Sequence, residues 1–266
     1  MMNFKKLSVT LGTVVLALGF AAGCSNNTSN KNTDTLSAVK KSGELKIGTE
    51  GTYAPFTFHD KSGKLTGFDV DLANEVAKRL GVKPTYFETQ WDSLAAGLDS
   101  KRFDMMANEV GIRPDRQKQY LFSEPYSTSS AALVVPSSNN KIKSFNDIKG
   151  LQSAQSLTSN YGDLAKKYGA QIVGIEGFSQ AVQLVESNRA DVTINDKLAV
   201  QNYLTETGDK SVKIAEIEKA AISSGFMFRK TDDSLAKAVN KALDDMKKDG
   251  TYNRIVEKWF GKNGLK

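Results

Sequence analysis

The sequence has 266 residues, of which 39% are hydrophobic and 25% are charged, and its formal charge is +6 at pH 7. This length can bury the cores of two lobes or domains, and the composition is that of an ordinary globular protein. The lysines and arginines are scattered, which argues against a nucleic-acid surface, and a single cysteine excludes an intrachain disulfide.

The N-terminus has the pattern of a secretory signal. Lys5 and Lys6 precede an apolar run over residues 7–20, which at roughly 14 residues is too short to span a bilayer. Small residues then lead to Cys24. We expect residues 1–23 to be a signal peptide and to lie outside the folded part of the protein.

Cys24 directly follows Ala21, Ala22 and Gly23, an arrangement that resembles the lipobox of bacterial lipoproteins. The resemblance implies that Cys24 becomes the mature N-terminus and carries a diacylglyceryl anchor of the palmitate type. The polar residues 24–35 contain almost no apolar side chains and are expected to form a flexible tether.

The first folded elements are short. Residues 45–49 alternate into a strand, Glu50 and Tyr53 belong to the polar and aromatic loop that follows, and residues 58–67 have the pattern of a hairpin. His59, at the hairpin's edge, is the only histidine in the chain and is predicted to be a surface residue rather than a metal ligand or a base.

An alternation of helices and strands comes next. Asp69 is expected to cap a helix that ends at Gly81. A strand is expected over residues 84–88, a helix over 91–98 and a strand over 103–107. This β-α-β-α-β order predicts a largely parallel sheet.

The stretch over residues 103–126 carries the strongest signal of a binding site. Its apolar run turns polar at Asn108 and Glu109, and the carboxyl ends of strands are where open α/β sheets place their ligands. Gly111 allows close approach to the backbone, and Pro114 suits the first turn of a short helix that contains Arg116. The planar fork of an arginine matches a carboxylate.

The second half of the chain repeats the α/β rhythm. Strands are expected over residues 131–135, 171–175, 191–194 and 222–228, and helices over 159–168, 179–188, 235–246 and 252–260. The strand over 191–194 is followed by Asn195 and Asp196.

Several motifs together resemble the family 3 extracellular solute-binding proteins, which serve ABC transporters of polar amino acids. They are GFDVDLANEVAKRL from Gly67, IGTEGTYAPF from Ile47, the stretch from Phe103, FSEPY and NRADVTIND. The resemblance covers the chain from about residue 36 onward. It implies an α/β fold of the periplasmic-binding-protein-like type II, with two lobes joined by a two-strand hinge. Lobe 1 would comprise residues 36–130 and 225–266, and lobe 2 residues 131–224.

The resemblance also implies ligand contacts. They are carried over by motif to Glu50, Tyr53, Trp91, Asn108, Gly111, Arg116, Ser159, Asn160 and Asp196. In this interpretation Arg116 and the helix N-terminus at Ser159 bind the ligand's carboxylate. Asp196 and Glu50 pair with its ammonium group. Burying a zwitterion requires such a partner for each charge. Partners on opposite lobes would meet the ligand only in a closed cleft.

Two residues depart from the family pattern. Arg113 stands where threonine is usual, and Glu109 stands where a small or polar residue is usual. Two extra charges of opposite sign suit a ligand with a second zwitterionic head. The stretches NEVGIRPDR and TINDKLA also look similar to the cystine-binding branch, so L-cystine is the hypothesised ligand. The alternative is that Glu109 and Arg113 only pair with each other at the rim of the cleft.

The sequence thus predicts a monomeric, lipid-anchored amino-acid-binding protein on the outer face of the cell membrane, with an ABC permease as its partner. No catalytic residue, cofactor, metal or nucleic acid is expected. The alternatives are a dehydratase-like enzyme and a ligand-sensing domain on the same scaffold. The cleft motifs contain no histidine, no cysteine and no proton-shuttling pair, which argues against the enzyme.

Overall fold

The structure is a computed structural model, and it describes residues 34–262 and residue 264. The predicted signal peptide, Cys24 and the predicted tether up to residue 33 lie outside the described residues. Thr35, which was assigned to the tether, instead begins helix α1 (Thr35–Ser42), which the sequence analysis missed.

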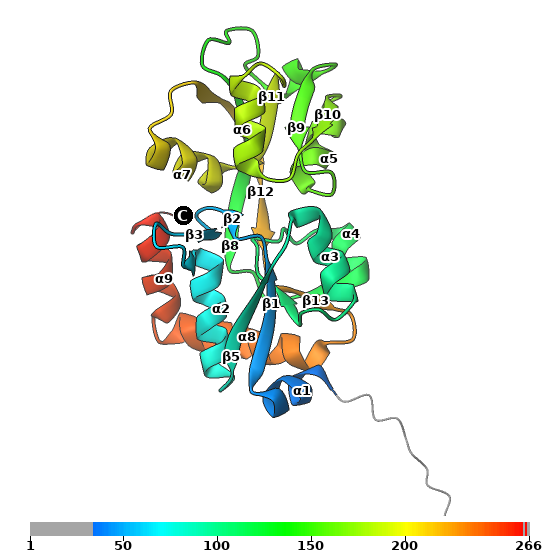
Figure 1. The fold of residues 1–266 in the computed structure, drawn as a ribbon, viewed down its shortest axis with the longest axis vertical. Helices are drawn as coiled ribbons and strands as arrows, with labels where there is room; N and C mark the ends of the chain where they lie inside the picture. Colours follow the sequence, from blue (N-terminus) through cyan, green and yellow to red (C-terminus); the bar gives the residue numbers. More distant parts are fainter. Residues whose placement is uncertain (1–33, 263, 265–266) are drawn as a thin grey trace, which may run out of the picture. The chain divides into compact units, whose positions relative to one another are not determined.

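Helices and strands alternate, and two five-stranded sheets confirm the α/β fold class (Figure 1). The helix over Lys197–Thr207 and the strands over Tyr120–Phe122 and Gln152–Gln155 were not predicted. We call the two sheets and their helices lobe 1 and lobe 2. The sheet of lobe 1 has the order β5-β1-β6-β13-β7, and that of lobe 2 the order β10-β9-β11-β8-β12. The boundaries expected between the lobes, at residues 130/131 and 224/225, stay a prediction.

Lobe 1 contains the first part of the chain and its C-terminal helices. Its strands are β1 (Glu44–Thr49), β5 (Lys83–Glu88), β6 (Met105–Met106), β7 (Tyr120–Phe122) and β13 (Met227–Arg229). A small sheet of β2 (Thr52–Tyr53), β3 (Thr57–His59) and β4 (Leu65–Thr66) contains the predicted hairpin. Its further helices are α2 (Phe68–Arg79), α3 (Trp91–Asp99), α4 (Pro114–Gln119), α8 (Asp233–Lys248) and α9 (Thr251–Phe260).

Strands β1, β5 and β6 are parallel, as predicted, whereas β13 pairs antiparallel with both β6 and β7. Strand β6 is shorter than the predicted run over residues 103–107, and the ring of Phe103, two residues before it, is fully buried. A Cβ atom on Gly48 would lie 2.4 Å from that ring and one on Gly97 would lie 2.6 Å from it. These two glycines therefore make the space that the ring fills.

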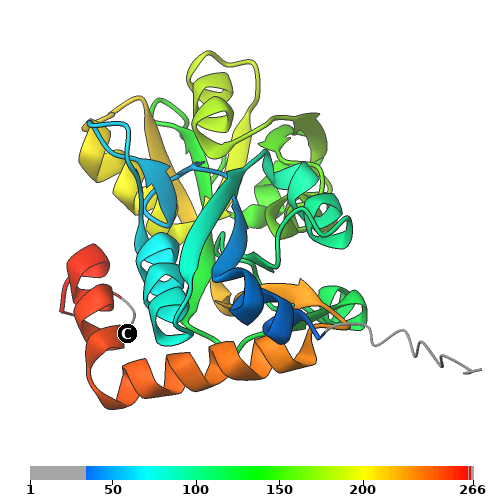
Figure 2. The ribbon, with the colours of Figure 1, turned by 60° about the horizontal axis from the view of Figure 1, so that its bottom comes forward.

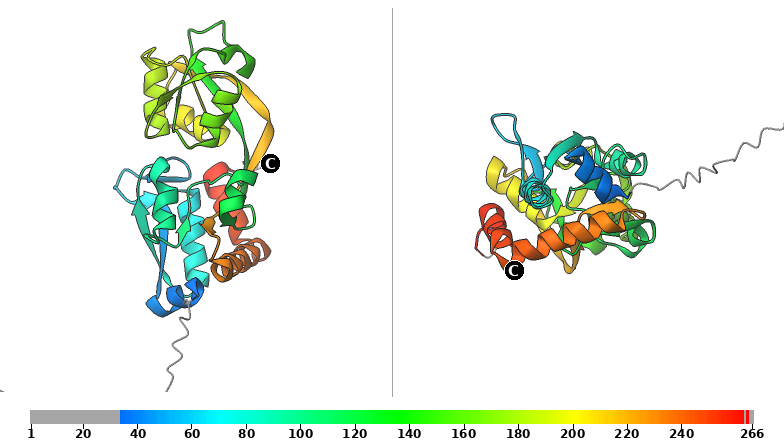
Figure 3. Two further views of the ribbon diagram at one scale, coloured as in Figure 1. Left: turned by 90° about the vertical axis from the view of Figure 1, so that its right-hand side faces the viewer. Right: turned by 90° about the horizontal axis from the view of Figure 1, so that it is seen from below.

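Helices α8 and α9 complete the core of lobe 1. The apolar face of α8 includes Leu235, Val239, Leu243 and Met246, all fully buried. Figure 2 shows α8 running along the lobe with α9 at its end, and Figure 3 shows the same pair from below. The amphipathic pattern over residues 235–246 is thus confirmed.

Lobe 2 is built around a mixed sheet. Its elements are β8 (Ser127–Pro136), the 3₁₀ helix η1 (Phe145–Ile148), β9 (Gln152–Gln155), α5 (Asn160–Lys167), β10 (Gln171–Gly174), α6 (Phe178–Glu186), β11 (Val192–Asp196), α7 (Lys197–Thr207) and β12 (Val212–Ser224). Strands β9, β10 and β11 are parallel, so the carboxyl ends of β9 and β11 meet at one edge of the sheet.

Strands β8 and β12 pair antiparallel from Ser127 opposite Ser224 to Pro136 opposite Val212. The left view of Figure 3 shows them side by side, with β12 leading back towards lobe 1. The sequence predicted only the last residues of β12, because lysine and glutamate residues interrupt its apolar side chains and leave no long apolar run. Among the described residues, no helix is both long and apolar enough to cross a membrane.

Candidate ligand-binding site

The carboxyl ends of β1 and β6 place Glu50 against Asn108. The side-chain oxygen of Asn108 accepts hydrogen bonds from the Glu50 backbone N–H (2.8 Å) and from the Thr49 hydroxyl (3.1 Å). Its amide nitrogen donates to the Glu50 carboxylate at 2.5 Å. The carboxyl ends of two adjacent parallel strands thus bring both side chains together.

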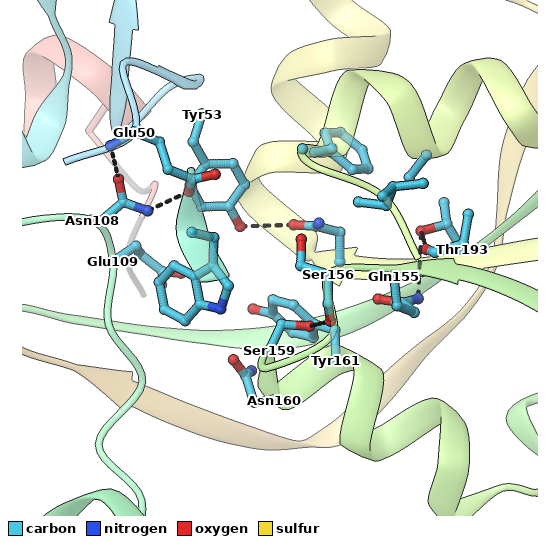
Figure 4. A pocket seen from close by; sticks show the side chains of 17 residues that line it. Glu50, Tyr53, Asn108, Glu109, Gln155, Ser156, Ser159, Asn160, Tyr161 and Thr193 are labelled. Carbon is cyan, nitrogen blue, oxygen red and sulfur yellow. Dashed lines mark hydrogen bonds between the residues drawn. The ribbon is translucent and has the colours of Figure 1, made fainter. Parts of the chain in front are cut away.

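A pocket opens beside this pair and is lined from both lobes (Figure 4). Its lining surrounds about 500 Å³ of space, part of which is open to solvent. Of the predicted contacts, those that line it are Glu50, Tyr53, Trp91, Asn108, Glu109, Ser159 and Asn160.

The remaining predicted residues lie just outside this lining. Arg116 lies behind Trp91, with its guanidinium carbon 5.2 Å from the centre of the indole ring. Its Nη1 donates to the Gly111 carbonyl at 3.1 Å. Arg113 is further out, and its guanidinium pairs with Asp115 and, at 2.9 Å, with Asp163 of lobe 2. The alternative in which Arg113 pairs with Glu109 is therefore wrong.

Glu109 is buried at the base of the pocket in the left-handed backbone region, with φ of 49°. Its carboxylate accepts a 3.0 Å hydrogen bond from the Ser224 hydroxyl. Burial raises the pKa of Glu109 well above its ordinary range, and the nearby carboxylates of Asp196 and Asp69 add to the rise. The hydrogen bond from Ser224 and the positive charge of Arg116 oppose the rise.

Asp69 does not cap helix α2, contrary to the prediction. Gly67 occupies the cap position, and Asp69 lies fully buried in the first turn. Its carboxylate accepts 2.6 Å hydrogen bonds from the Glu109 backbone N–H and the Tyr126 hydroxyl. The Asp69 carboxylate therefore binds the Glu109 backbone and does not cap helix α2.

Asp196 ends β11 and caps helix α7. Its Oδ1 accepts hydrogen bonds from the backbone N–H groups of Leu198 (2.7 Å) and Ala199 (3.3 Å). The Tyr161 hydroxyl lies 3.3 Å from its other oxygen. Burial raises the pKa of Asp196 despite these bonds.

Glu50 is the other strongly shifted acid of the pocket. Burial raises its pKa to about 7, the hydrogen bond from Asn108 opposes the rise, and the negative charge of Asp92 adds to it. Burial also lowers the pKa of Arg116 to about 10. The site thus collects three buried acids, Asp69, Glu109 and Asp196, and the half-buried Glu50.

The pocket contains residues that the sequence analysis did not select, among them Gln155, Tyr161, Phe178 and Asn195. Asn195 accepts a 2.7 Å hydrogen bond from the Tyr53 hydroxyl, so the two lobes touch directly there (Figure 4). Its place at the end of β11, next to Asp196, could have identified Asn195 as a site residue from the sequence. Gln155 ends β9 in the same way, whereas nothing in the local sequence marked Tyr161 or Phe178.

Helix α5 begins at the pocket. Ser159 caps it by accepting a 3.0 Å hydrogen bond from the Gly162 backbone N–H, as the sequence analysis expected for a helix N-terminus here. The first N–H groups of a helix point outward and carry a partial positive charge. An anion at this end of the pocket is therefore favoured.

Comparison with known proteins identifies close relatives. The chain is 51% identical over 265 residues to the L-cystine-binding protein TcyA of Bacillus subtilis, covering 97% of this chain and 98% of that protein. It is 38% identical to the L-cystine-binding protein TcyJ of Escherichia coli K12, covering 93% of each. These two relatives confirm the similarity to the cystine-binding branch that the sequence motifs indicated.

Two solved structures show how the lobes compare. An ancestral arginine-binding protein bound to arginine, 38% identical, aligns with a TM-score of 0.79 and covers 82% of this chain and 99% of that one. The L-cystine solute receptor of Neisseria gonorrhoeae in its unliganded open conformation is 46% identical, covers 87% and 98%, and aligns with a TM-score of only 0.57. This chain therefore superposes less well on the open, unliganded receptor than on the arginine-bound protein, although its sequence is closer to that of the receptor.

Residues 45–262 match the profile of the bacterial extracellular solute-binding proteins, family 3. This match covers more than half of the chain, and the relatives above are similar over nearly all of it. The chain therefore belongs to the bacterial extracellular solute-binding proteins of family 3.

Proposed function

We propose that this protein is the substrate-binding component of an ABC importer for polar amino acids, that it is lipid-anchored through Cys24 on the outer face of the cell membrane, and that its ligand is L-cystine. The ligand would bind between the lobes, with its ammonium groups near the buried acids and a carboxylate near Arg116 and the start of α5.

The observation that carries the ligand proposal is the excess of buried acid. Glu50 and Glu109 both line the pocket, and Asp196 lies beside it. One α-ammonium group can pair with one or two carboxylates, and each further buried carboxylate keeps its proton unless another cation pairs with it. L-Cystine carries two α-ammonium groups, so it supplies the second cation.

The names of the relatives support the same ligand class. Two relatives are L-cystine-binding proteins, and two similar structures are arginine-binding proteins. Arginine also carries two cationic groups, so it is the competitor that matters most. Asn160 and Ser159 would then meet one carboxylate at the helix N-terminus, whichever of the two ligands binds.

A thermal-shift screen of the natural amino acids and L-cystine tests the proposal. A ligand that binds only the folded chain raises the melting temperature by mass action. We expect L-cystine to give the largest shift, with arginine, histidine and glutamine behind it. A larger shift with arginine would refute the cystine assignment and leave the transport role standing.

An enzyme on the same scaffold remains the competing function, since one similar structure is a precursor of cyclohexadienyl dehydratase. A mass spectrum of the incubation mixture separates the two functions. A binding protein returns L-cystine unchanged, whereas a lyase or dehydratase leaves products of altered mass.

A further inference from the structure

We infer that Asp92 is a positioning residue that latches lobe 1 to the turn before helix α5 of lobe 2, and that this latch slows the escape of a bound ligand. The inference rests on the proposed function only for the choice of the kinetic probe. We call the contact between Asp92 and residues 157 and 158 the Asp92 latch.

The Asp92 latch consists of three hydrogen bonds to one carboxylate. Asp92 is the second residue of α3, in lobe 1. Its oxygens accept from the backbone N–H of Leu157 (3.2 Å), the backbone N–H of Thr158 (3.0 Å) and the Thr158 hydroxyl (2.6 Å). All three donors belong to lobe 2, so the bonds break when the lobes separate.

The latch lies next to the pocket on both sides. Trp91 precedes Asp92 and lines the pocket, and Ser159 follows Thr158 and lines it too. Asp92 and Thr158 themselves are not part of that lining and are exposed. The latch can therefore stabilise closure without choosing among ligands.

The same segment of lobe 2 is bound by lobe 1 at two further points. The Arg116 guanidinium donates to the Thr158 carbonyl at 3.4 Å, and that of Arg113 donates to the Asp163 carboxylate at 2.9 Å. Residues 157–163 thus form one part of lobe 2 that lobe 1 holds, in addition to the contact between Tyr53 and Asn195. Asp92 differs from the two arginines because it alone satisfies backbone N–H groups of the turn, and a negative charge is also favourable near the start of α5.

The expected effect is kinetic. A ligand reaches the open cleft without the latch, so its loss should leave the association rate unchanged. A ligand leaves only after the lobes part, so the loss should raise the dissociation rate. For exposed, charge-assisted hydrogen bonds we expect a rise of about three- to tenfold.

The chain offers a matched control. The Asp60 carboxylate accepts the same kinds of bond, from the Ser62 backbone N–H (2.8 Å), the Ser62 hydroxyl (2.6 Å) and the Lys64 backbone N–H (3.1 Å). These partners belong to its own turn in lobe 1. Asp60→Ala therefore removes equivalent bonds that do not join the lobes.

Stopped-flow tryptophan fluorescence on the full chain, with L-cystine as the probe, gives both rates. We expect Asp92→Ala to raise the dissociation rate about three- to tenfold and Asp60→Ala to leave it unchanged. A dissociation rate in Asp92→Ala equal to that of the parent, or an equal rise in Asp60→Ala, overturns the inference.

A third variant separates the latch from an effect of charge, because the negative charge of Asp92 also acts on Glu50. Thr158→Val removes one latch bond and no charge. It should raise the dissociation rate about twofold. If Asp92→Ala speeds dissociation and Thr158→Val does not, the effect passes through Glu50 and the latch is refuted.

Hydrogen exchange of the chain saturated with L-cystine, in which the lobes are closed, tests the contact directly. We expect the Leu157 and Thr158 amides to exchange faster in Asp92→Ala than in the parent, whereas Asp60→Ala leaves them unchanged. Equal exchange in Asp92→Ala and the parent refutes the latch. If the parent fails to bind L-cystine, the ligand proposal fails, and the same exchange and kinetic measurements with L-arginine decide the latch.

Discussion

The carboxylate of Asp69 accepts a 2.6 Å hydrogen bond from the backbone N–H of Glu109, a residue 40 positions further along the chain. Helix α2 thereby supports the strained backbone from which the Glu109 side chain enters the pocket. One buried acid thus sets the position of another, and burial is the largest cause of the raised pKa of each. Two consequences concern stability and ligand binding separately.

The stability of the parent should fall with rising pH because of Asp69. Burial raises the pKa of Asp69 from 3.8 to about 7. Between these values the unfolded chain ionises and the folded chain keeps the proton, so the free energy of unfolding decreases as pH rises through this window, by up to about 4 kcal/mol. Asp69→Asn should remove that part of the slope.

Urea unfolding of the parent and Asp69→Asn from about pH 4 to pH 8 measures the difference. Relative to the parent, the variant should gain stability up to about pH 7 and then stay level. Parallel curves for the two proteins would show that Asp69 does not hold its proton in the folded state. Asp69 also raises the pKa of Glu109, so both proteins are compared in a Glu109→Gln background.

Ligand affinity should rise with pH because of Glu50. Its pKa of about 7 in the protein means that the group holds a proton below neutrality. An ammonium group bound beside it favours the ionised form, so binding releases a proton and the affinity increases up to about pH 7. Titration calorimetry in two buffers of different ionisation heat counts that proton. The proton release should shrink in Glu50→Gln, and an unchanged release would assign it to another acid.

Loss of Arg116 or Asp196, the proposed partners of the ligand's charges, should weaken ligand binding far more than it weakens folding. Leaving one ligand charge unpaired costs on the order of 2 to 5 kcal/mol, which is tenfold to several thousandfold in affinity. Arg116→Ala tests the carboxylate side. Asp196→Asn tests the ammonium side and is preferable to alanine, because Asp196 also caps α7 and asparagine keeps a capping oxygen.

Calorimetry gives the affinity of these variants, and thermal melting of the ligand-free proteins gives their stability. An unchanged affinity in one variant removes that residue from the site. A loss of folding stability as large as the loss of binding free energy would indicate a structural role instead.

Glu109→Gln should discriminate between ligands with one cationic group and ligands with two. The substitution keeps the shape of the side chain and its contact with Ser224, and it removes the charge that a second ammonium group would need. We expect L-cystine to lose at least about tenfold in affinity and glutamine to lose little. Equal losses for both ligands would contradict a role for Glu109 in recognising a second head.

Cys24→Ser should release the protein from membranes, because two acyl chains give firm anchoring and a polar N-terminus gives none. Carbonate-washed membranes from cells that express the parent or the variant are compared by immunoblot. Full retention of the variant in the membrane fraction would exclude Cys24 as the anchor.

The sequence by itself determined the order of most elements, the α/β class and the family. Helix α8 and strand β1 were predictable because apolar side chains repeat with the period of the element that buries them. Glu50 and Asn108 were predictable for a related reason: both follow parallel strands, and the carboxyl ends of such strands meet at one edge of the sheet. These signals depend on residues that are close together in the sequence, so the sequence alone is enough to recognise them.

Only the tertiary structure decided which charges meet. The sequence placed Asp69 at a helix cap and considered Arg113 as a partner of Glu109. The structure instead brings Asp69 to the Glu109 backbone and Arg113 to Asp163 of the other lobe. A helix start looks the same in sequence whether its acid faces water or the core, and a pairing across two lobes depends on how both are placed in space. Burial and distance, which set the strength of a charge interaction, exist only once the chain has folded.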